Sequence, residues 1–123
     1  MEKYKNTVGR LGEDVASKYL EDNGYKIIEK NYFCRFGEID IVAMDNNCLV
    51  FIEVKTRTSD KYGRPENAVN YWKKRHLELT ARNYIDHKKK ANFIARFDVV
   101  EVFGKYADNS FIVENVNLIK NVL

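Results

Sequence analysis

The sequence has few of the residues from which disulfide-stapled, zinc-binding and membrane-embedded proteins are built. It contains one proline and two cysteines, Cys34 and Cys48, so neither a disulfide framework nor a zinc site with a CxxC pair is expected. No apolar run approaches the roughly 18 residues that span a bilayer, and the N-terminal segment has no apolar stretch of the signal-peptide kind. We therefore expect a cytoplasmic protein with two free thiols and no membrane partner.

The net charge of the sequence is also small. The 21 lysines and arginines outnumber the 18 aspartates and glutamates by three, which permits binding to a polyanion without requiring it. Hydrophobic residues make up 45% of the 123 residues, enough to form a core. One domain over residues 1–123 is expected, because no linker, repeat or low-complexity segment divides the chain.

Hydrophobic periodicity predicts seven elements in the order α-β-β-β-α-β-β. Helices are expected over residues 6–23 and 70–90, and strands over residues 25–34, 37–44, 48–56, 93–103 and 110–116. This order favours an α/β fold with a mixed central sheet of about five strands flanked by the helices. The strand over residues 48–56 is almost continuously apolar, which is typical of a central strand covered on both faces.

Each helix has an apolar stripe that should face the sheet. The stripes are Val8, Leu11, Val15 and Tyr19 in the first helix and Leu77, Ala81, Tyr84 and Ile85 in the second. Glu13 lies at the margin of the first stripe. Lys73 continues the second stripe one turn earlier, so it should point toward the sheet, where a phosphate or a metal-bound water would be a suitable partner. We expect Trp72 to pack against the protein rather than to stack on bases.

Two charged residues interrupt the most apolar strand. Glu53 and Lys55 lie two apart in CLVFIEVKT, so they share one face of the strand. An unpaired buried charge costs several kcal/mol, a cost for which folding alone gives no reason. Asp40 is a similar anomaly in the preceding strand, GEIDIVA, with Glu38 and Val42 on its face. If the two strands pair as a hairpin, Asp40 comes close to Glu53 and Lys55.

Two interpretations of this trio stay open. Adjacent carboxylates repel each other unless a divalent cation lies between them, and oxygen ligands of this kind suit Mg²⁺ or Mn²⁺. With such a metal, Lys55 could orient or deprotonate an attacking water or stabilise the transition state of phosphodiester hydrolysis. The alternative is a structural ion pair between Glu53 and Lys55, with Asp40 near the surface.

Four motifs, GRLGEDVASKYL, GEIDIVA, VFIEVKTR and RFDVVEV, occur in this order. Together they resemble the YraN-like family of uncharacterised bacterial proteins, which is assigned to the restriction-endonuclease-like superfamily and is similar to archaeal Holliday junction resolvases. The resemblance implies a PD-(D/E)xK site in which Asp40 and Glu53 are metal ligands and Lys55 is the catalytic lysine. It also implies that Glu13 matches the helix glutamate that some members add to the metal site. Position 39 is Ile where the superfamily's name has Pro.

The resulting hypothesis is a Mg²⁺-dependent endonuclease that acts on DNA rather than RNA, on branched or repair-intermediate structures. Thr56, Arg57 and Arg64 flank the trio and, with Lys73, are expected to contact the nucleic acid, because arginine matches phosphate geometry. A homodimer would supply two sites for two strands. The first alternative is a nucleic-acid-binding module with the nuclease fold but little or no catalytic activity. The second is a protein-interaction subunit that uses the same fold.

Overall fold

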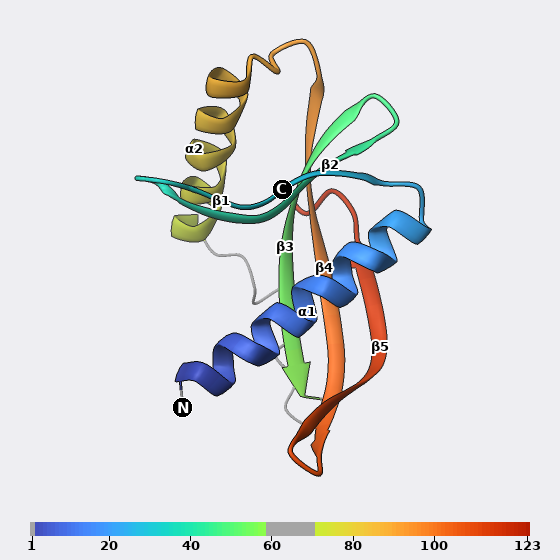
Figure 1. Cartoon of the computed structure of the whole chain (residues 1–123). Coiled ribbons are helices and arrows are strands. Elements are labelled where there is room, and N and C mark those ends of the chain that lie inside the picture. Colours follow the sequence, from blue (N-terminus) through green and yellow to red (C-terminus); the bar gives the residue numbers. More distant parts are fainter. Residues whose placement is uncertain (1, 59–70) are drawn as a thin grey trace.

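The computed structural model describes residues 2–58 and 71–123 and contains the seven expected elements in the expected order. They are α1 (Glu2–Asp22), β1 (Lys26–Cys34), β2 (Gly37–Asp45), β3 (Cys48–Thr58), α2 (Tyr71–Lys88), β4 (Ile94–Ala107) and β5 (Ser110–Ile119). A mixed α/β fold with five strands and two helices is therefore confirmed (Figure 1). Both cysteines are free thiols, as expected. Neither helix in the described ranges is long and apolar enough to cross a membrane.

The sheet follows the chain, with the strand order β1-β2-β3-β4-β5. Neighbouring strands are antiparallel except β3 and β4, which run parallel. A parallel pair needs a crossover connection, and α2 lies in the connection between these two strands. The β3–β4 pairing extends from Cys48 and Ile94 to Thr58 and Gly104, so β3 is the long central strand.

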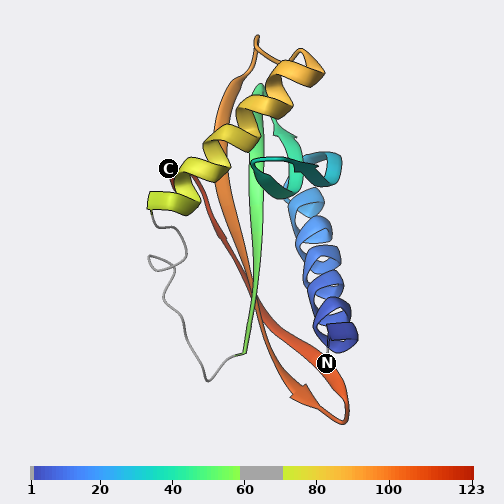
Figure 2. The ribbon, with the colours of Figure 1, turned by 90° about the vertical axis from the view of Figure 1, so that its left-hand side faces the viewer.

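The two helices cover opposite faces of the sheet, as Figure 2 shows. On one face Ala16 and Leu20 of α1 pack in a cluster with Val50 and Ile52 of β3. On the other face Ala81 and Tyr84 of α2 pack with Leu49 and Phe51. Residues 49–52 are at most 1% exposed. The prediction of a central strand covered on both faces is confirmed, and the buried stripe of α2 is confirmed with it.

The face of α1 that contacts the sheet differs from the predicted stripe. Val15 of the predicted stripe packs against the core, but Ala16 is fully buried and Leu11 is 37% exposed, so the stripe is wrong at Leu11. The cause is Gly12, where an added Cβ would lie 2.1 Å from Oγ1 of Thr56. Only glycine lets α1 approach β3 this closely, and small residues rather than large ones therefore set the contact. Glu13 follows directly after this contact.

β2 separates from β3 close to Asp40. The ladder between the two strands ends at the pair Ile41 and Ile52. Beyond it the backbone N–H of Val54 donates to the Asp40 side chain, at 2.8 Å from Oδ2. Strict alternation along β2 is wrong here, because Ile39 packs on the α2 side of the sheet whereas Ile41 packs on the α1 side. Because β2 leaves the ladder here, the Asp40 carboxylate rather than a backbone carbonyl of β2 accepts the hydrogen bond from the Val54 N–H.

Trp72 in the first turn of α2 is mostly exposed to solvent. Its side chain is 70% exposed, so the packing prediction is wrong. The neighbouring Lys73 and Leu77, which lie one helical turn apart, both face the sheet, as the spacing predicted. Trp72 is rotated about 100° from that stripe and points outward.

Candidate active site

Three charged side chains meet on the α2 side of β3. Glu53 lies within 2.5 Å of Lys73 and 3.3 Å of Lys55, both distances measured from its Oε2 to the lysine Nζ. The expectation that Lys73 points toward the sheet is confirmed, although its partner here is a carboxylate. Oε1 of Glu53, by contrast, is buried and accepts no hydrogen bond from any residue of the described ranges 2–58 and 71–123. Half of this carboxylate is therefore doubly paired and half is unsatisfied.

The two lysines respond to this arrangement in opposite directions. Burial lowers the pKa of Lys55, and the neighbouring Lys73 lowers it further, which outweighs the attraction of Glu53. Burial also disfavours the charged form of Lys73, but its contact with Glu53 prevails and raises its pKa. Lys55 is thus the ammonium that gives up its proton more readily.

Asp40 is held in an environment that disfavours its charge. Burial is the main cause that raises its pKa from 3.8 to about 6, and the negative charges of Glu13, Glu53 and Glu38 raise it further. The hydrogen bond from the Val54 N–H acts in the opposite direction. The ion pair between Glu53 and Lys55 that the alternative predicted is present, but Asp40 is half-buried rather than near the surface.

Glu13 reaches this region through the close approach of α1 to β3. Its charge raises the pKa of Asp40 more than those of Glu53 and Glu38 do. The structure thus brings Asp40, Glu53 and Glu13 within electrostatic reach of one another. Within residues 2–58 and 71–123, however, no three His, Cys, Asp or Glu side chains converge closely enough to form a metal-binding group by themselves.

This donor set still fits one class of cation. Mg²⁺ is commonly bound through one or two carboxylates, with waters and substrate phosphates completing its octahedron. Asp40 and Glu53 supply hard oxygen donors, and no described residue donates a competing hydrogen bond to Oε1 of Glu53. The ammonium of Lys73 lies at Oε2 and would have to share or leave the Glu53 carboxylate when a cation binds. The residues therefore suit Mg²⁺ or Mn²⁺ rather than zinc.

A cavity of about 210 Å³ opens beside these carboxylates, between α2 and the sheet. Glu38, Asp40 and Glu53 supply its acidic wall, and Phe51 and Leu77 contribute apolar wall. The cavity is smaller than the roughly 300–1,000 Å³ of pockets that enclose drug-sized ligands. It suits a hydrated cation or one phosphate group better than a whole cofactor.

The predicted flanking residues divide among three environments. The Thr56 hydroxyl lies against Gly12, on the α1 side of β3 and away from Lys55. Arg57 lies on the same side of β3 as Lys55, with its Nε 3.3 Å from Oε2 of Glu101. Arg64 lies outside the described residues. That these three bind nucleic acid stays a prediction.

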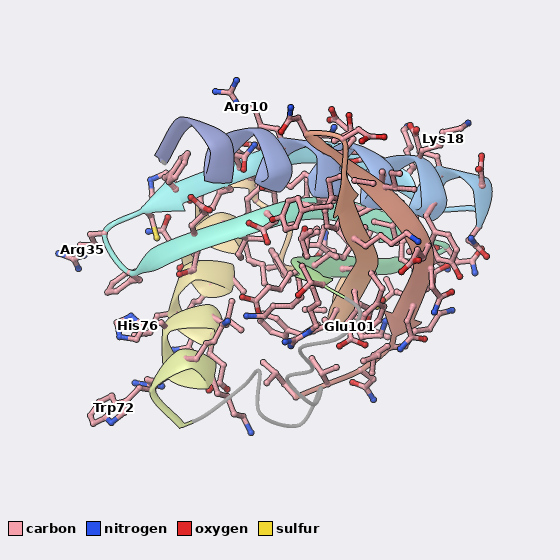
Figure 3. The ribbon with its side chains drawn as sticks, turned by 90° about the horizontal axis from the view of Figure 1, so that it is seen from below. Arg10, Lys18, Arg35, Trp72, His76 and Glu101 are labelled. Carbon is pink, nitrogen blue, oxygen red and sulfur yellow. The ribbon has the colours of Figure 1, made fainter. Side chains whose placement is uncertain are left out.

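Glu101 is a site-adjacent residue that the sequence interpretation missed. It is 1% exposed, pairs with Lys55 in the β3–β4 register and accepts a 3.1 Å hydrogen bond from Asn117 of β5. Figure 3 shows it beneath the strands on the side of α2. The signal that could have found it is a lone carboxylate in the apolar run VVEVF, the same anomaly that singled out Glu53.

Comparison with known sequences places the chain in a family. Residues 12–102 match the sequence pattern of UPF0102, which is described as an uncharacterised protein family. The chain belongs to the UPF0102 family. A UPF0102 protein of Caldicellulosiruptor saccharolyticus is 42% identical over 117 residues, covering 95% of this chain and 97% of its own length. Another, of Syntrophus aciditrophicus, is 51% identical over 94 residues, covering 76% of this chain and 74% of its own length.

The part of the chain that matches UPF0102 includes the whole cluster described above. Glu13, Asp40, Glu53, Lys55 and Lys73 all fall within residues 12–102. A third relative, a UPF0102 protein of Caldanaerobacter subterraneus, is 43% identical over 117 residues, which is 95% of this chain and 94% of its own length. Membership of a family of uncharacterised proteins is thus confirmed, and the relation of UPF0102 to nucleases stays a prediction.

Proposed function

We propose that this UPF0102 protein is a metal-dependent nuclease of the restriction-endonuclease-like, PD-(D/E)xK type, which hydrolyses phosphodiester bonds in DNA with Mg²⁺ or Mn²⁺. One observation carries the proposal: Glu53 is half-buried, its Oε1 is fully buried and has no hydrogen-bond partner among the described residues, and it lies beside Asp40, whose pKa is raised. Folding gains nothing from this arrangement, because an unpaired buried polar atom costs about 1–3 kcal/mol. A divalent cation between the two carboxylates would remove both costs.

Each residue of the cluster then has a part in hydrolysis. Asp40 and Glu53 would hold the cation, with Glu13 as an outer acidic partner. A cation there would supply Lewis-acid chemistry, neutralising phosphate charge and acidifying a bound water. Lys55, with its lowered pKa, is suited to accept a proton from the attacking water. Lys73, once released from Glu53, would bind the phosphate, because an ammonium is a compact phosphate ligand.

The test is a cleavage screen on junction, flap, single-stranded and duplex DNA with Mn²⁺ or Mg²⁺, run beside Glu53→Gln. Removing one ligand oxygen should reduce cleavage by more than the roughly 100-fold that loss of a single transition-state hydrogen-bond donor costs. Glu114→Gln is the matched control, since Glu114 pairs with Lys105 on the surface, 39% exposed and far along the β4–β5 hairpin. Metal-dependent cleavage that survives Glu53→Gln would refute the mechanism.

A second candidate function is a nucleic-acid-binding module that keeps the fold without turnover. The contact of Lys73 with Glu53 favours it, because a protein ammonium then neutralises the carboxylate without a metal. Calorimetry separates the two: failure to bind Mn²⁺ at millimolar concentration supports the binding module. Binding by this module would weaken steeply with salt, by about 0.9 log units per phosphate contact for each log unit of salt.

A further inference from the structure

The turn between β1 and β2 meets the outer flank of α2 at a surface of planar side chains. His76 of α2 hydrogen-bonds through Nδ1 to the backbone oxygen of Phe36 in the turn, at 2.8 Å. The guanidinium of Arg35 lies over the ring of Phe36, 4.8 Å from its centroid. Trp72 lies one helical turn before His76. We call Arg35, Phe36, Trp72 and His76 the aromatic rim; Figure 3 shows three of them along one flank.

Burial in the hydrophobic core does not account for the aromatic rim. Single exposed apolar residues are normal on protein surfaces, but a tryptophan that is 70% exposed contributes little to a core. Arg35 and His76 are exposed beside it. What is unusual is that four groups with flat faces gather at one contact between a hairpin and a helix. Such groups are the side chains on which nucleic-acid bases stack.

The charge around the rim fits a polyanion. Lys74 and Arg75 are exposed on the same helix, and its first turn carries no acidic residue. Cations near a helix N-terminus oppose the helix dipole, so the fold itself gains nothing from them. Trp72 and Lys73, whose ammonium contacts Glu53, lie on neighbouring faces of the first turn of α2. A strand bound at Glu53 would therefore meet the same helical turn that carries Trp72.

We infer that the aromatic rim binds unpaired bases of a nucleic-acid strand by stacking, with Trp72 as the main platform. For the nuclease proposed above, on which this specificity rests, the preferred substrate then contains single-stranded nucleotides beside the cleaved bond rather than continuous duplex. The bases of a duplex are stacked on one another and offer no face to an indole. Base binding itself needs neither metal nor turnover, so it can be tested separately.

Trp72 is the only tryptophan in the chain, so its fluorescence reports on this surface directly. The titration uses an oligothymidylate in EDTA, which prevents cleavage. The expected result is saturable quenching, and an affinity for labelled oligothymidylate that falls about tenfold in Trp72→Ala but stays near the wild-type value in Trp72→Phe. A strand of the same length with abasic sugars supplies phosphates without bases, and Trp72→Ala should bind it as the wild type does.

The control is Phe93→Ala, which removes an exposed ring beyond the other end of α2 that also has a lysine, Lys90, over its face. It should bind oligothymidylate like the wild type. Unchanged fluorescence, equal binding by Trp72→Ala, or an equal loss on the abasic strand would overturn the inference. Thermal unfolding of Trp72→Ala should match the wild type, since the side chain is mostly exposed. Quenching without any metal-dependent cleavage would contradict the nuclease and leave the base-binding surface standing.

Discussion

Two regions of the sheet bury carboxylates, and they differ in how completely those carboxylates are paired. Asp98 of β4 is 1% exposed and accepts four hydrogen bonds, from Tyr25 Oη at 2.9 Å, Arg96 Nε at 2.9 Å, Arg96 Nη2 at 2.8 Å and the Asn121 N–H at 3.0 Å. Glu53 of β3 has two ammonium groups on one oxygen, whereas the other has no hydrogen-bond partner in the described part of the chain.

The comparison shows that burial of a charge is a weaker sign of function than incomplete pairing. At Asp98 the hydrogen bonds favour the positive charge of Arg96 strongly enough to raise its pKa, despite its partial burial. Such a fully satisfied network holds strands and the C-terminal segment together. At Glu53 and Asp40 the cost of burial is only partly compensated, which is the condition expected of a site that receives a ligand charge.

The largest effect is expected from breaking the satisfied network. Asp98→Ala leaves Arg96 and Tyr25 without their central acceptor, and removing one partner of a buried pair costs about 3–5 kcal/mol. Urea denaturation should show this loss, while Glu114→Ala at the surface pair with Lys105 changes stability by less than about 0.5 kcal/mol. A loss below about 1 kcal/mol for Asp98→Ala would mean that the network is not structural.

Asp40→Asn, in contrast, should stabilise the folded protein. The Asp40 pKa rises from 3.8 to about 6 on folding, so the folded protein holds a proton there that the unfolded chain has released. Stability of the wild type therefore falls as pH rises through this window, and the penalty is complete above it. Asn cannot ionise and still accepts from Val54. The free energy of unfolding of the variant should exceed that of the wild type by up to about 3 kcal/mol above pH 6, and the two should be equal below about pH 4.

Denaturation in EDTA near pH 4 and near pH 7.5 measures this difference. Asp98→Asn is the matched control, because the same substitution in the satisfied network should destabilise. If Asp40→Asn also destabilises the protein at the higher pH, Asp40 and Asp98 do not differ in how well their charges are paired.

The sequence predicted the charged cluster better than the surfaces around it. The positions of Glu53, Lys55 and Lys73 followed from strand alternation and helical spacing, which are local rules. The placement of Asp40 near Glu53 was predicted through strict alternation, a rule that fails there. β2 leaves β3 at this point, and the Asp40 side chain accepts the hydrogen bond that a backbone carbonyl would otherwise accept. Pairing between distant residues, such as Arg57 with Glu101, has no local signature in the sequence.

Errors arose where large side chains were assumed to face inward. The stripe of α1 was misplaced because periodicity weighs Leu11 above Gly12, whereas the close contact with Thr56 requires the glycine. Trp72 was expected to be buried because it is large and apolar, although a helix can bury only one face at a time. Both errors concern which face of a helix meets the sheet, and only tertiary packing decides that.

Gly12→Ala tests whether this close contact brings α1 to the unsatisfied cluster. The added methyl would overlap Oγ1 of Thr56, and overpacking of this kind costs about 1–3 kcal/mol. Gly9→Ala is the matched control, because nothing lies within 4 Å of its added Cβ and alanine favours the helix. Thermal unfolding should show a loss for the first and none for the second. Recovery in Gly12→Ala with Thr56→Ala would confirm the overlap, whereas equal effects of the two glycine variants would exclude it.

The smallest effect is expected from replacing Lys73. This substitution tests whether the Glu53 carboxylate is incompletely paired because it binds a cation. The Lys73 ammonium contacts Oε2 of Glu53, so it competes with any metal for that carboxylate. Lys73→Met keeps the aliphatic stem and removes the competitor. Calorimetry should then show tighter Mn²⁺ binding, by about tenfold or 1.4 kcal/mol.

Lys74→Met controls for charge alone, since Lys74 is the next residue on α2 but is exposed. It should leave Mn²⁺ affinity nearly unchanged, because an exposed charge is screened by solvent and salt. Tightening in Lys73→Met that disappears when Glu53→Gln is added would place the competition at this carboxylate. Equal Mn²⁺ affinity in Lys73→Met and the wild type would instead mean that the ammonium and the carboxylate form a permanent pair. The Glu53 region would then be a second, less complete version of the Asp98 network rather than a site.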